Sequence, residues 1–115
     1  MNIFVSYTTR NNEVTIDALI NFSNKINSFG KIFIDLIDND SIDKQGRIIT
    51  ELGSTDLLIL IKSESILNSE WVKFELETAI KLKIPVIEFN IIEIESLTKK
   101  EIESKIEEAQ PPTSV

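Results

Sequence analysis

A continuous run of apolar residues from Leu57 to Ile61 is the feature that most restricts the fold of this chain. The run has the length of a strand, and its five large aliphatic side chains leave neither face of such a strand suited to water. Strands of this kind are typical of parallel sheets that helices cover on both sides. We therefore expect residues 56–61 to form the central strand of an α/β domain.

The rest of the chain alternates between strand-like and helix-like segments. The strand-like segments are rich in β-branched and aromatic residues, and the helix-like segments carry apolar residues at intervals of three and four. We expect strands at residues 2–7, 31–37, 56–61 and 85–89, and helices at 13–29, 42–52, 69–82 and 97–109. Such alternation predicts right-handed βαβ units, and so an α/β, three-layer, flavodoxin-like sandwich with a four- to five-stranded parallel sheet.

Two short segments are less constrained by their sequence. Residues 91–94 are mostly isoleucine, which fits either an extension of the last strand or a crossover to the final helix. Residues 111–115 follow the last helix and begin with two consecutive prolines, so we expect a disordered tail.

The composition narrows the chemistry that this fold can support. Nineteen acidic against twelve basic residues give a net charge of −7, which disfavours nucleic acid and anionic lipid as partners. The chain has no cysteine and no histidine, which excludes thiol nucleophiles, a Ser-His-Asp triad and the usual zinc ligands, so we expect no metal. No apolar run has membrane-spanning length and the first residues are not basic, so we expect a cytoplasmic protein without a membrane partner.

One acidic residue lies within the apolar side of the helix expected at residues 69–82. A helical wheel places Glu75 in the same arc as six apolar residues, Trp71, Val72, Leu76, Ala79, Ile80 and Leu82. An unpaired buried carboxylate is costly, so this one must reach water, a buried partner or a cleft. Parallel sheets bind ligands outside the carboxyl ends of their strands. Glu75 is therefore either part of a structural ion pair or a functional acid beside that crevice.

Four segments occur in the order found in TIR (Toll/interleukin-1 receptor) domains, and each resembles the matching part of that family. Residues 4–7 resemble the first box, residues 32–35 the second strand and residues 54–63 the third strand. The segment from Ser69 to Leu76 is similar to the family's Ser-x-Trp-x-x-x-Glu-Leu motif. The resemblance covers about residues 2–90 and implies a TIR-like domain over residues 1–110.

The resemblance to bacterial-type, NAD-cleaving TIR domains implies an enzyme with Glu75 as its catalytic residue. Such an enzyme takes NAD+ as substrate, needs no cofactor, and yields nicotinamide with ADP-ribose or a cyclic isomer, for use in defence or stress signalling. Breaking the nicotinamide–ribose bond passes through an oxocarbenium-like state that a carboxylate can stabilise or attack. Nicotinamide leaves as a neutral base, so the absence of histidine is no obstacle.

The same resemblance implies a substrate-binding set around the loops that follow the strands. These residues are Ser6, Tyr7, Thr8, Thr9, Arg10, Asp35, Ser63 and Trp71. Arg10 is either a phosphate ligand or a solvated loop charge. Asp35 either faces the crevice or ends its strand, and Trp71 is either core or a surface for the ligand.

Two departures from the family affect the expected partners and topology. Residues 36–46 lack the proline-glycine pair common in TIR loops that mediate assembly, which weakens the case for self-association through that loop. The segment after Asn90 is short for the family's fourth helix and fifth strand.

Two other functions stay open, and two are excluded. The chain could be a non-catalytic TIR-type module that binds another TIR domain or a second copy of itself. It could also be a nucleoside deoxyribosyltransferase-like enzyme, which pairs a similar sheet with a glutamate nucleophile. A phosphoacceptor receiver domain is excluded because no acidic pair follows the first strand. A Rossmann dehydrogenase is excluded because no Gly-x-Gly-x-x-Gly follows a strand.

Overall fold

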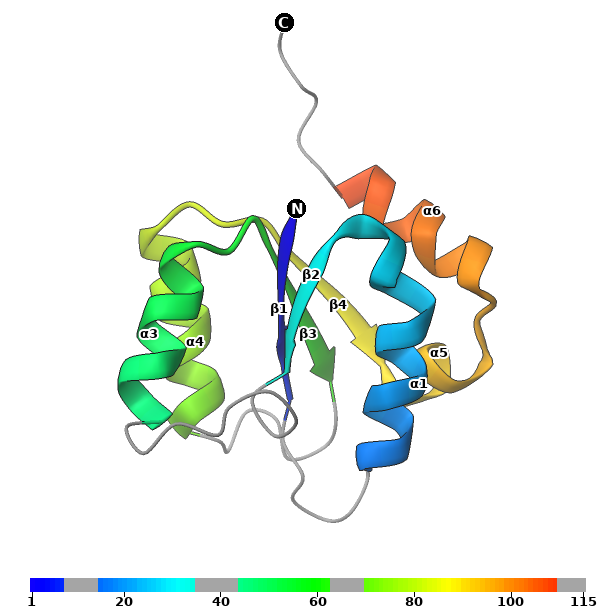
Figure 1. Cartoon of the computed structure of the whole chain (residues 1–115), viewed down its shortest axis with the longest axis horizontal. Coiled ribbons are helices and arrows are strands. Elements are labelled where there is room, and N and C mark those ends of the chain that lie inside the picture. Colours follow the sequence, from blue (N-terminus) through cyan, green and yellow to red (C-terminus); the bar gives the residue numbers. More distant parts are fainter. Residues whose placement is uncertain (8–14, 35–43, 63–69, 110–115) are drawn as a thin grey trace, which may run out of the picture.

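The computed structural model of the chain is an α/β sandwich with a four-stranded, all-parallel sheet (Figure 1). It describes residues 1–7, 15–34, 44–62 and 70–109, with only the backbone of residues 44, 45, 70, 71 and 109. The elements are β1 (Asn2–Ser6), α1 (Ile16–Ile26), the 3₁₀ turn η2 (Asn27–Phe29), β2 (Lys31–Ile34), α3 (Lys44–Gly53), β3 (Leu57–Lys62), α4 (Glu70–Lys81), β4 (Val86–Asn90), α5 (Ile91–Ser96) and α6 (Lys99–Ala109). The architecture expected from the sequence is confirmed, with four strands in the described part of the chain.

The strand order β2-β1-β3-β4 makes β1 and β3 the inner strands. In β3, the apolar run that suggested a strand covered on both faces lies between β1 and β4, and all five of its aliphatic side chains are buried. The strands β2 and β4 are the two edges of the sheet. Ser6 at the end of β1 lies beside Leu60 of β3, so these two strands reach the carboxyl edge of the sheet together.

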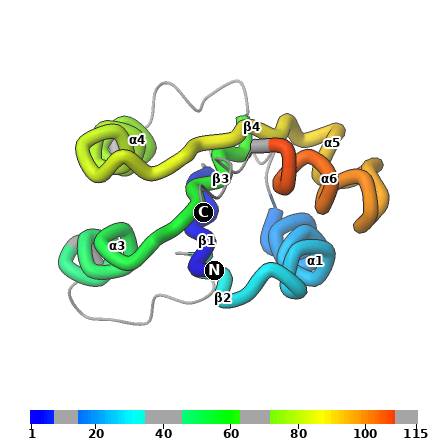
Figure 2. Tube along the Cα trace, turned by 90° about the horizontal axis from the view of Figure 1, so that it is seen from above, coloured from blue at the N-terminus to red at the C-terminus, as the bar shows by residue number. Residues whose placement is uncertain are grey.

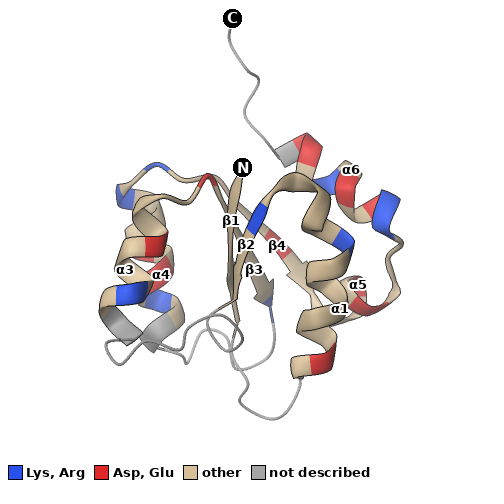
Figure 3. Cartoon of the chain, viewed as in Figure 1, with Lys and Arg blue, Asp and Glu red and all other residues tan. Residues whose placement is uncertain are grey.

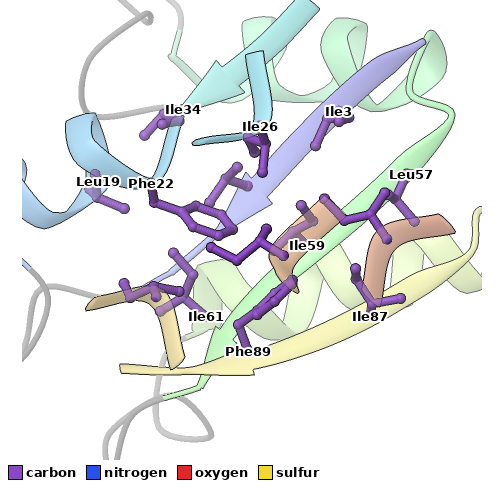
Figure 4. Close-up of a cluster of buried hydrophobic side chains, with 14 residues drawn as sticks. Ile3, Leu19, Phe22, Ile26, Ile34, Leu57, Ile59, Ile61, Ile87 and Phe89 are labelled. Atoms are coloured by element: carbon purple, nitrogen blue, oxygen red, sulfur yellow. The ribbon is translucent and has the colours of Figure 1, made fainter. Parts of the chain in front are cut away.

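Two cores flank the sheet, because successive side chains of a strand point to opposite faces. Ile3 and Ile59 belong to one core, with side chains of α1, α5 and α6, whereas Phe4 and Leu58 belong to the other, with side chains of α3 and α4. The view from above shows these two groups of helices on opposite sides of the sheet (Figure 2). Figure 4 shows the larger core, where side chains from α1 and from β1, β3 and β4 converge. There the rings of Phe22 and Phe89 meet edge to face with their centroids 5.4 Å apart.

The helix expected at residues 13–29 is shorter than the sequence pattern suggests. It begins at Ile16, where the Thr15 hydroxyl caps it by accepting a hydrogen bond from the backbone N–H of Ala18 at 3.1 Å. The α-helix ends at Ile26 and continues as the 3₁₀ turn η2 up to Gly30, whose φ of 135° is open to glycine and strained for other residues. This turn leads the chain directly into β2.

Residues 91–94 do not extend β4, which rules out the first of the two alternatives; they are helical and lead from β4 to the final helix α6. They begin α5, and the cause is a capping box at the end of β4. The Asn90 side-chain oxygen accepts a hydrogen bond from the Glu93 N–H at 2.8 Å, and the Glu93 carboxylate accepts one from the Asn90 N–H at 3.0 Å. These two bonds satisfy the first N–H groups of a helix, which outweighs the strand preference of isoleucine.

The apolar arc expected for α4 is only partly correct. Val72 and Ala79 are buried against the sheet, whereas Ile80 is 72% exposed and Leu82, just beyond the helix, is 49% exposed. The buried sector of α4 is therefore narrower than the apolar half of its helical wheel. In the described part of the chain, no helix combines the length and the apolar character required to cross a membrane.

We expect low pH to weaken the contact between α5 and α6, and Glu93 is the titratable group responsible. The Asn90 N–H, and next the Lys105 ammonium 3.0 Å from the carboxylate, hold the pKa of Glu93 below its ordinary value of 4.5. Because the pKa of Glu93 is lower in the folded chain than in the unfolded chain, ionised Glu93 stabilises the fold fully above the unfolded pKa. This stabilisation disappears as the pH falls through the folded pKa. Glu93→Gln should therefore flatten the loss of stability below about pH 4.5.

Urea unfolding at neutral pH and in acid measures this difference directly. The matched control is Glu107→Gln, because Glu107 is an exposed glutamate on α6. The control should keep the acid sensitivity of the parent chain. If Glu93→Gln keeps it as well, the capping box and the Lys105 contact do not control the acid response.

Candidate functional site

Among the described residues, two polar side chains are buried, and both belong to the layer between the sheet and the pair α3 and α4. Ser6 is 1% exposed and Glu75 is 6% exposed. Ser6 lies two residues after Phe4 on β1 and so shares its face, while Glu75 lies on the buried side of α4 between Val72 and Ala79. The sequence prediction that the Glu75 carboxylate is carried inward is confirmed.

Both groups also lie toward the same end of the sheet. Ser6 is the last residue of β1, at the carboxyl edge. The helix α4 follows the carboxyl end of β3, and Glu75 is five residues into it, about 7.5 Å along the helix axis from Glu70. Ligands of parallel sheets bind outside this edge. The fold thus brings a buried carboxylate and a buried hydroxyl toward the end of the sheet where ligands bind.

The hydroxyl of Ser6 is the more unusual of the two groups. Its oxygen is fully buried and has no hydrogen-bond partner among the residues that the structure describes. A buried hydroxyl left without a partner costs about 1–3 kcal/mol, and such groups are few in folded proteins. A serine kept at this position is thus suited to donate to, or accept from, a ligand atom that enters at the carboxyl edge.

The surroundings of Glu75 strengthen its electrostatic effect. Besides Ser6, the described buried residues of its layer are aliphatic and aromatic, and include Phe4, Leu60 and Val72. A charge among such side chains acts through a medium of lower dielectric constant than water, so it attracts a developing positive charge more strongly than a solvated carboxylate would. The arrangement can stabilise a cationic reaction centre without a metal.

The remaining predicted substrate-binding residues divide into three groups. Tyr7 is half-buried and packs against the core on the α1 side, so it does not share a face with Ser6. Trp71 lies in the first turn of α4, where the structure describes its backbone. The others lie outside the described residues, and they are Thr8, Thr9, Arg10, Asp35 and Ser63.

A hollow of about 430 Å³ lies on the opposite face of the sheet, between α1 and α5. Thr15, Asp17 and Lys25 of the α1 segment and Glu95 of α5 contribute to its lining. The Lys25 ammonium donates hydrogen bonds to the carbonyl oxygens of Ile94 and Leu97, each at 3.1 Å, and thereby holds the end of α5 against α1. Sequence reasoning missed this contact, because it joins residues about 70 positions apart. The Lys25 ammonium is thus bonded to backbone carbonyl oxygens, so its role is structural.

The chain offers no match from which a function could be transferred. Comparison with known protein families and with curated proteins finds no match. Within residues 1–7, 15–34, 44–62 and 70–109, no group of three or more acidic side chains is placed to hold a metal ion. Function must therefore be inferred from the parallel sheet, the buried Glu75 and the buried Ser6.

Proposed function

We propose that this protein cleaves the nicotinamide–ribose bond of NAD+, as a glycohydrolase or a cyclase, with Glu75 as the catalytic residue. The observation that carries the proposal is the burial of the Glu75 carboxylate on the inward side of α4, toward the carboxyl edge of a parallel sheet. The four segments that resemble TIR domains, in the same order along the chain, support the same activity. Such an enzyme would serve defence or stress signalling by consuming NAD+ or by making a signal from it.

The reaction needs little from the protein besides charge and position. The bond between the ribose C1′ and the nicotinamide nitrogen breaks, and its electron pair goes to the nitrogen, so nicotinamide leaves as a neutral molecule. The positive charge left on the ribose is the state that the Glu75 carboxylate stabilises, or captures as a covalent ester. Water then adds at C1′ and loses a proton to give ADP-ribose. If a nucleophilic atom of the same ADP-ribosyl group, instead of water, attacks C1′, the product is a cyclic isomer.

The residues at the carboxyl edge would bind and orient the substrate. The Ser6 hydroxyl lies at this edge, has no hydrogen-bond partner in the described part of the chain, and can hydrogen bond to a hydroxyl of the ribose. By the resemblance, Arg10 binds the diphosphate, while Tyr7, Thr8, Thr9, Asp35, Ser63 and Trp71 complete the site. Binding of the remote adenosine part would then hold the scissile bond beside Glu75.

Incubation of the pure protein with NAD+ tests the proposal. We expect nicotinamide to appear together with an equal amount of ADP-ribose or its cyclic isomer, which liquid chromatography separates and mass spectrometry identifies. The assay should span a wide range of protein concentration, so that an activity requiring self-association is not missed. Absence of nicotinamide at every concentration, from protein shown to be folded by circular dichroism, contradicts the proposal.

Parallel incubation with deoxynucleosides separates the two enzymatic possibilities. A deoxyribosyltransferase-like enzyme would also use Glu75, but it releases free base from a deoxynucleoside and leaves NAD+ intact. A folded protein that acts on neither substrate would leave the non-catalytic interaction module as the remaining function. Chromatography of the two incubations separates the three results, which are nicotinamide from NAD+, free base from a deoxynucleoside, or neither product.

A further inference from the structure

The outer edge of β4 presents backbone groups to which no described residue bonds. The Leu58 N–H donates to the Pro85 carbonyl oxygen at 2.9 Å, so Pro85 and Ile87 direct their backbone groups toward β3. Val86 and Glu88 alternate with them along the strand and direct their N–H and C=O groups away from the sheet. Neither residue makes an outward hydrogen bond to another residue that the structure describes.

The capping box of α5 closes this edge at its carboxyl end. Beyond Glu88, the N–H of Asn90 donates to the Glu93 carboxylate and is therefore occupied. The chain that leads into β4 and the helix that follows it both belong to the described residues, and neither covers the outward groups of Val86 and Glu88. An unpaired strand edge of this kind is a template on which another strand can pair.

Exposed apolar side chains are concentrated in the segment that leads into, forms and follows β4. Eight large apolar residues of the described chain are exposed, and four of them lie between residues 80 and 92. Ile80 in the last turn of α4 is 72% exposed, Val86 on β4 is 37% exposed, and Ile92 on α5 is 75% exposed. Apolar side chains next to an unpaired strand edge are what an added strand needs for packing, since its backbone alone would give little specificity.

The charge of Glu88 indicates which kind of segment fits this edge. Glu88 is the one charged residue of β4, lies at the middle of the strand and is exposed, and it is the red segment of β4 in Figure 3. Two copies that paired their β4 strands about this midpoint would bring two carboxylates opposite each other, which destabilises a strand pair. A basic side chain opposite Glu88 stabilises the pair instead. The net charge of −7 also attracts a cationic segment, so a basic partner fits better than a second copy.

We propose that the outer edge of β4 binds an extended segment of another protein, which lengthens the four-stranded sheet by one strand. The outward N–H and C=O groups of Val86 and Glu88 pair with the backbone of this segment. The segment places an apolar side chain beside Val86 and a lysine or arginine beside Glu88. Lys81 and Lys83 are exposed just before the strand, so the segment carries one basic residue and not a run of them. This inference does not depend on the cleavage of NAD+.

Two synthetic peptides test the proposal by NMR spectroscopy of the isotope-labelled chain. The first is acetyl-Thr-Val-Thr-Lys-Thr-Val-Thr-amide, whose side-chain pattern is the same in both directions from the lysine, so it suits parallel and antiparallel pairing. The second has glutamate in place of lysine. We expect the lysine peptide to bind with a Kd of about 1 mM or lower, and about fivefold more tightly than the glutamate peptide.

The amide signals locate the bound peptide. The amides of Val86 and Glu88 should shift and exchange their hydrogens more slowly in the complex, because they gain acceptors there, whereas the amide of Ile87 already bonds to β3. Absence of binding up to about 5 mM lysine peptide overturns the proposal. Equal affinity of the two peptides, or protection confined to residues outside β4, also overturns it.

Reversing the charge of Glu88 tests the chemistry of the partner. Glu88→Lys should bind the glutamate peptide about fivefold more tightly than the lysine peptide. The matched control is Glu95→Lys, which changes the net charge equally on α5, where Glu95 lines the hollow beside α1. This control should keep the preference for the lysine peptide, and the amide spectra of both variants report whether they are folded. If the two variants change the preference equally, the net charge of the chain selects the peptide, and the role assigned to Glu88 is wrong.

Discussion

Replacing Glu75 with glutamine is expected to lower the rate of nicotinamide release from NAD+ about 1000-fold while the fold survives. Glutamine has nearly the same size and shape as glutamate, so the packing beside Val72 and Ala79 is kept. It lacks the negative charge that the developing cation requires. Removing one electrostatic contact to a transition state costs about 10²–10³ in rate, and losing a covalent nucleophile costs more.

The control for this variant lies on the same helix. Glu77 is exposed on the outer side of α4, so Glu77→Gln removes an equal charge without touching the buried sector. Release of nicotinamide at saturating NAD+ should be unchanged in this control, and both variants should show the thermal unfolding of folded protein. Equal rates for Glu75→Gln and the wild type would remove Glu75 from the mechanism and leave the fold without an assigned catalytic group.

Replacing Gly30 with alanine is expected to destabilise the protein by about 3 kcal/mol. Gly30 has a φ of 135° and a ψ of −143°, a region that is open almost only to glycine. A Cβ atom there would lie 2.2 Å from the Met1 carbonyl oxygen, which accepts the hydrogen bond that pairs β2 with β1. Because the three atoms nearest to the new methyl group all belong to the backbone of Met1, which leads into β1, relief requires movement of that backbone.

Gly53→Ala is the matched control for Gly30→Ala. A Cβ atom at Gly53, the last residue of α3, meets nothing within 4 Å. Alanine also restricts the unfolded chain more than glycine does, so this variant should be neutral or up to about 1 kcal/mol more stable. Thermal unfolding measures both, and Gly30→Ala should lower Tm by roughly 10–20 °C. Equal Tm values for the two variants would show that the positive φ of Gly30 is not required.

The strands were predictable because their sequences fix how much of each must be buried. The run from Leu57 to Ile61 cannot lie at a surface, and the structure places it on an inner strand with both faces covered. The inward position of Glu75 was predictable for the same reason, because neighbours three and four residues away on a helix share its side.

Two expectations differed from the structure, for different reasons. The apolar half of the α4 wheel includes Ile80, but the part of α4 that touches the sheet is narrower than that half. The isoleucines after Asn90 favour a strand, yet two hydrogen bonds of a capping box begin a helix there. The first outcome depends on how much of the helix meets the sheet, whereas the second follows from the Asn90–Glu93 pair, three residues apart, which outweighs the strand preference of isoleucine.

The sequence by itself determined the alternation of strands and helices, the inner character of β3 and the inward direction of Glu75, because each follows from hydrophobic burial over short distances along the chain. The tertiary structure alone decided that Ser6 is buried in the same layer as Glu75 and that β2 and β4 are the outer strands of the sheet. Strand order brings together residues that are far apart in sequence, and their proximity results from the packing of the whole sheet.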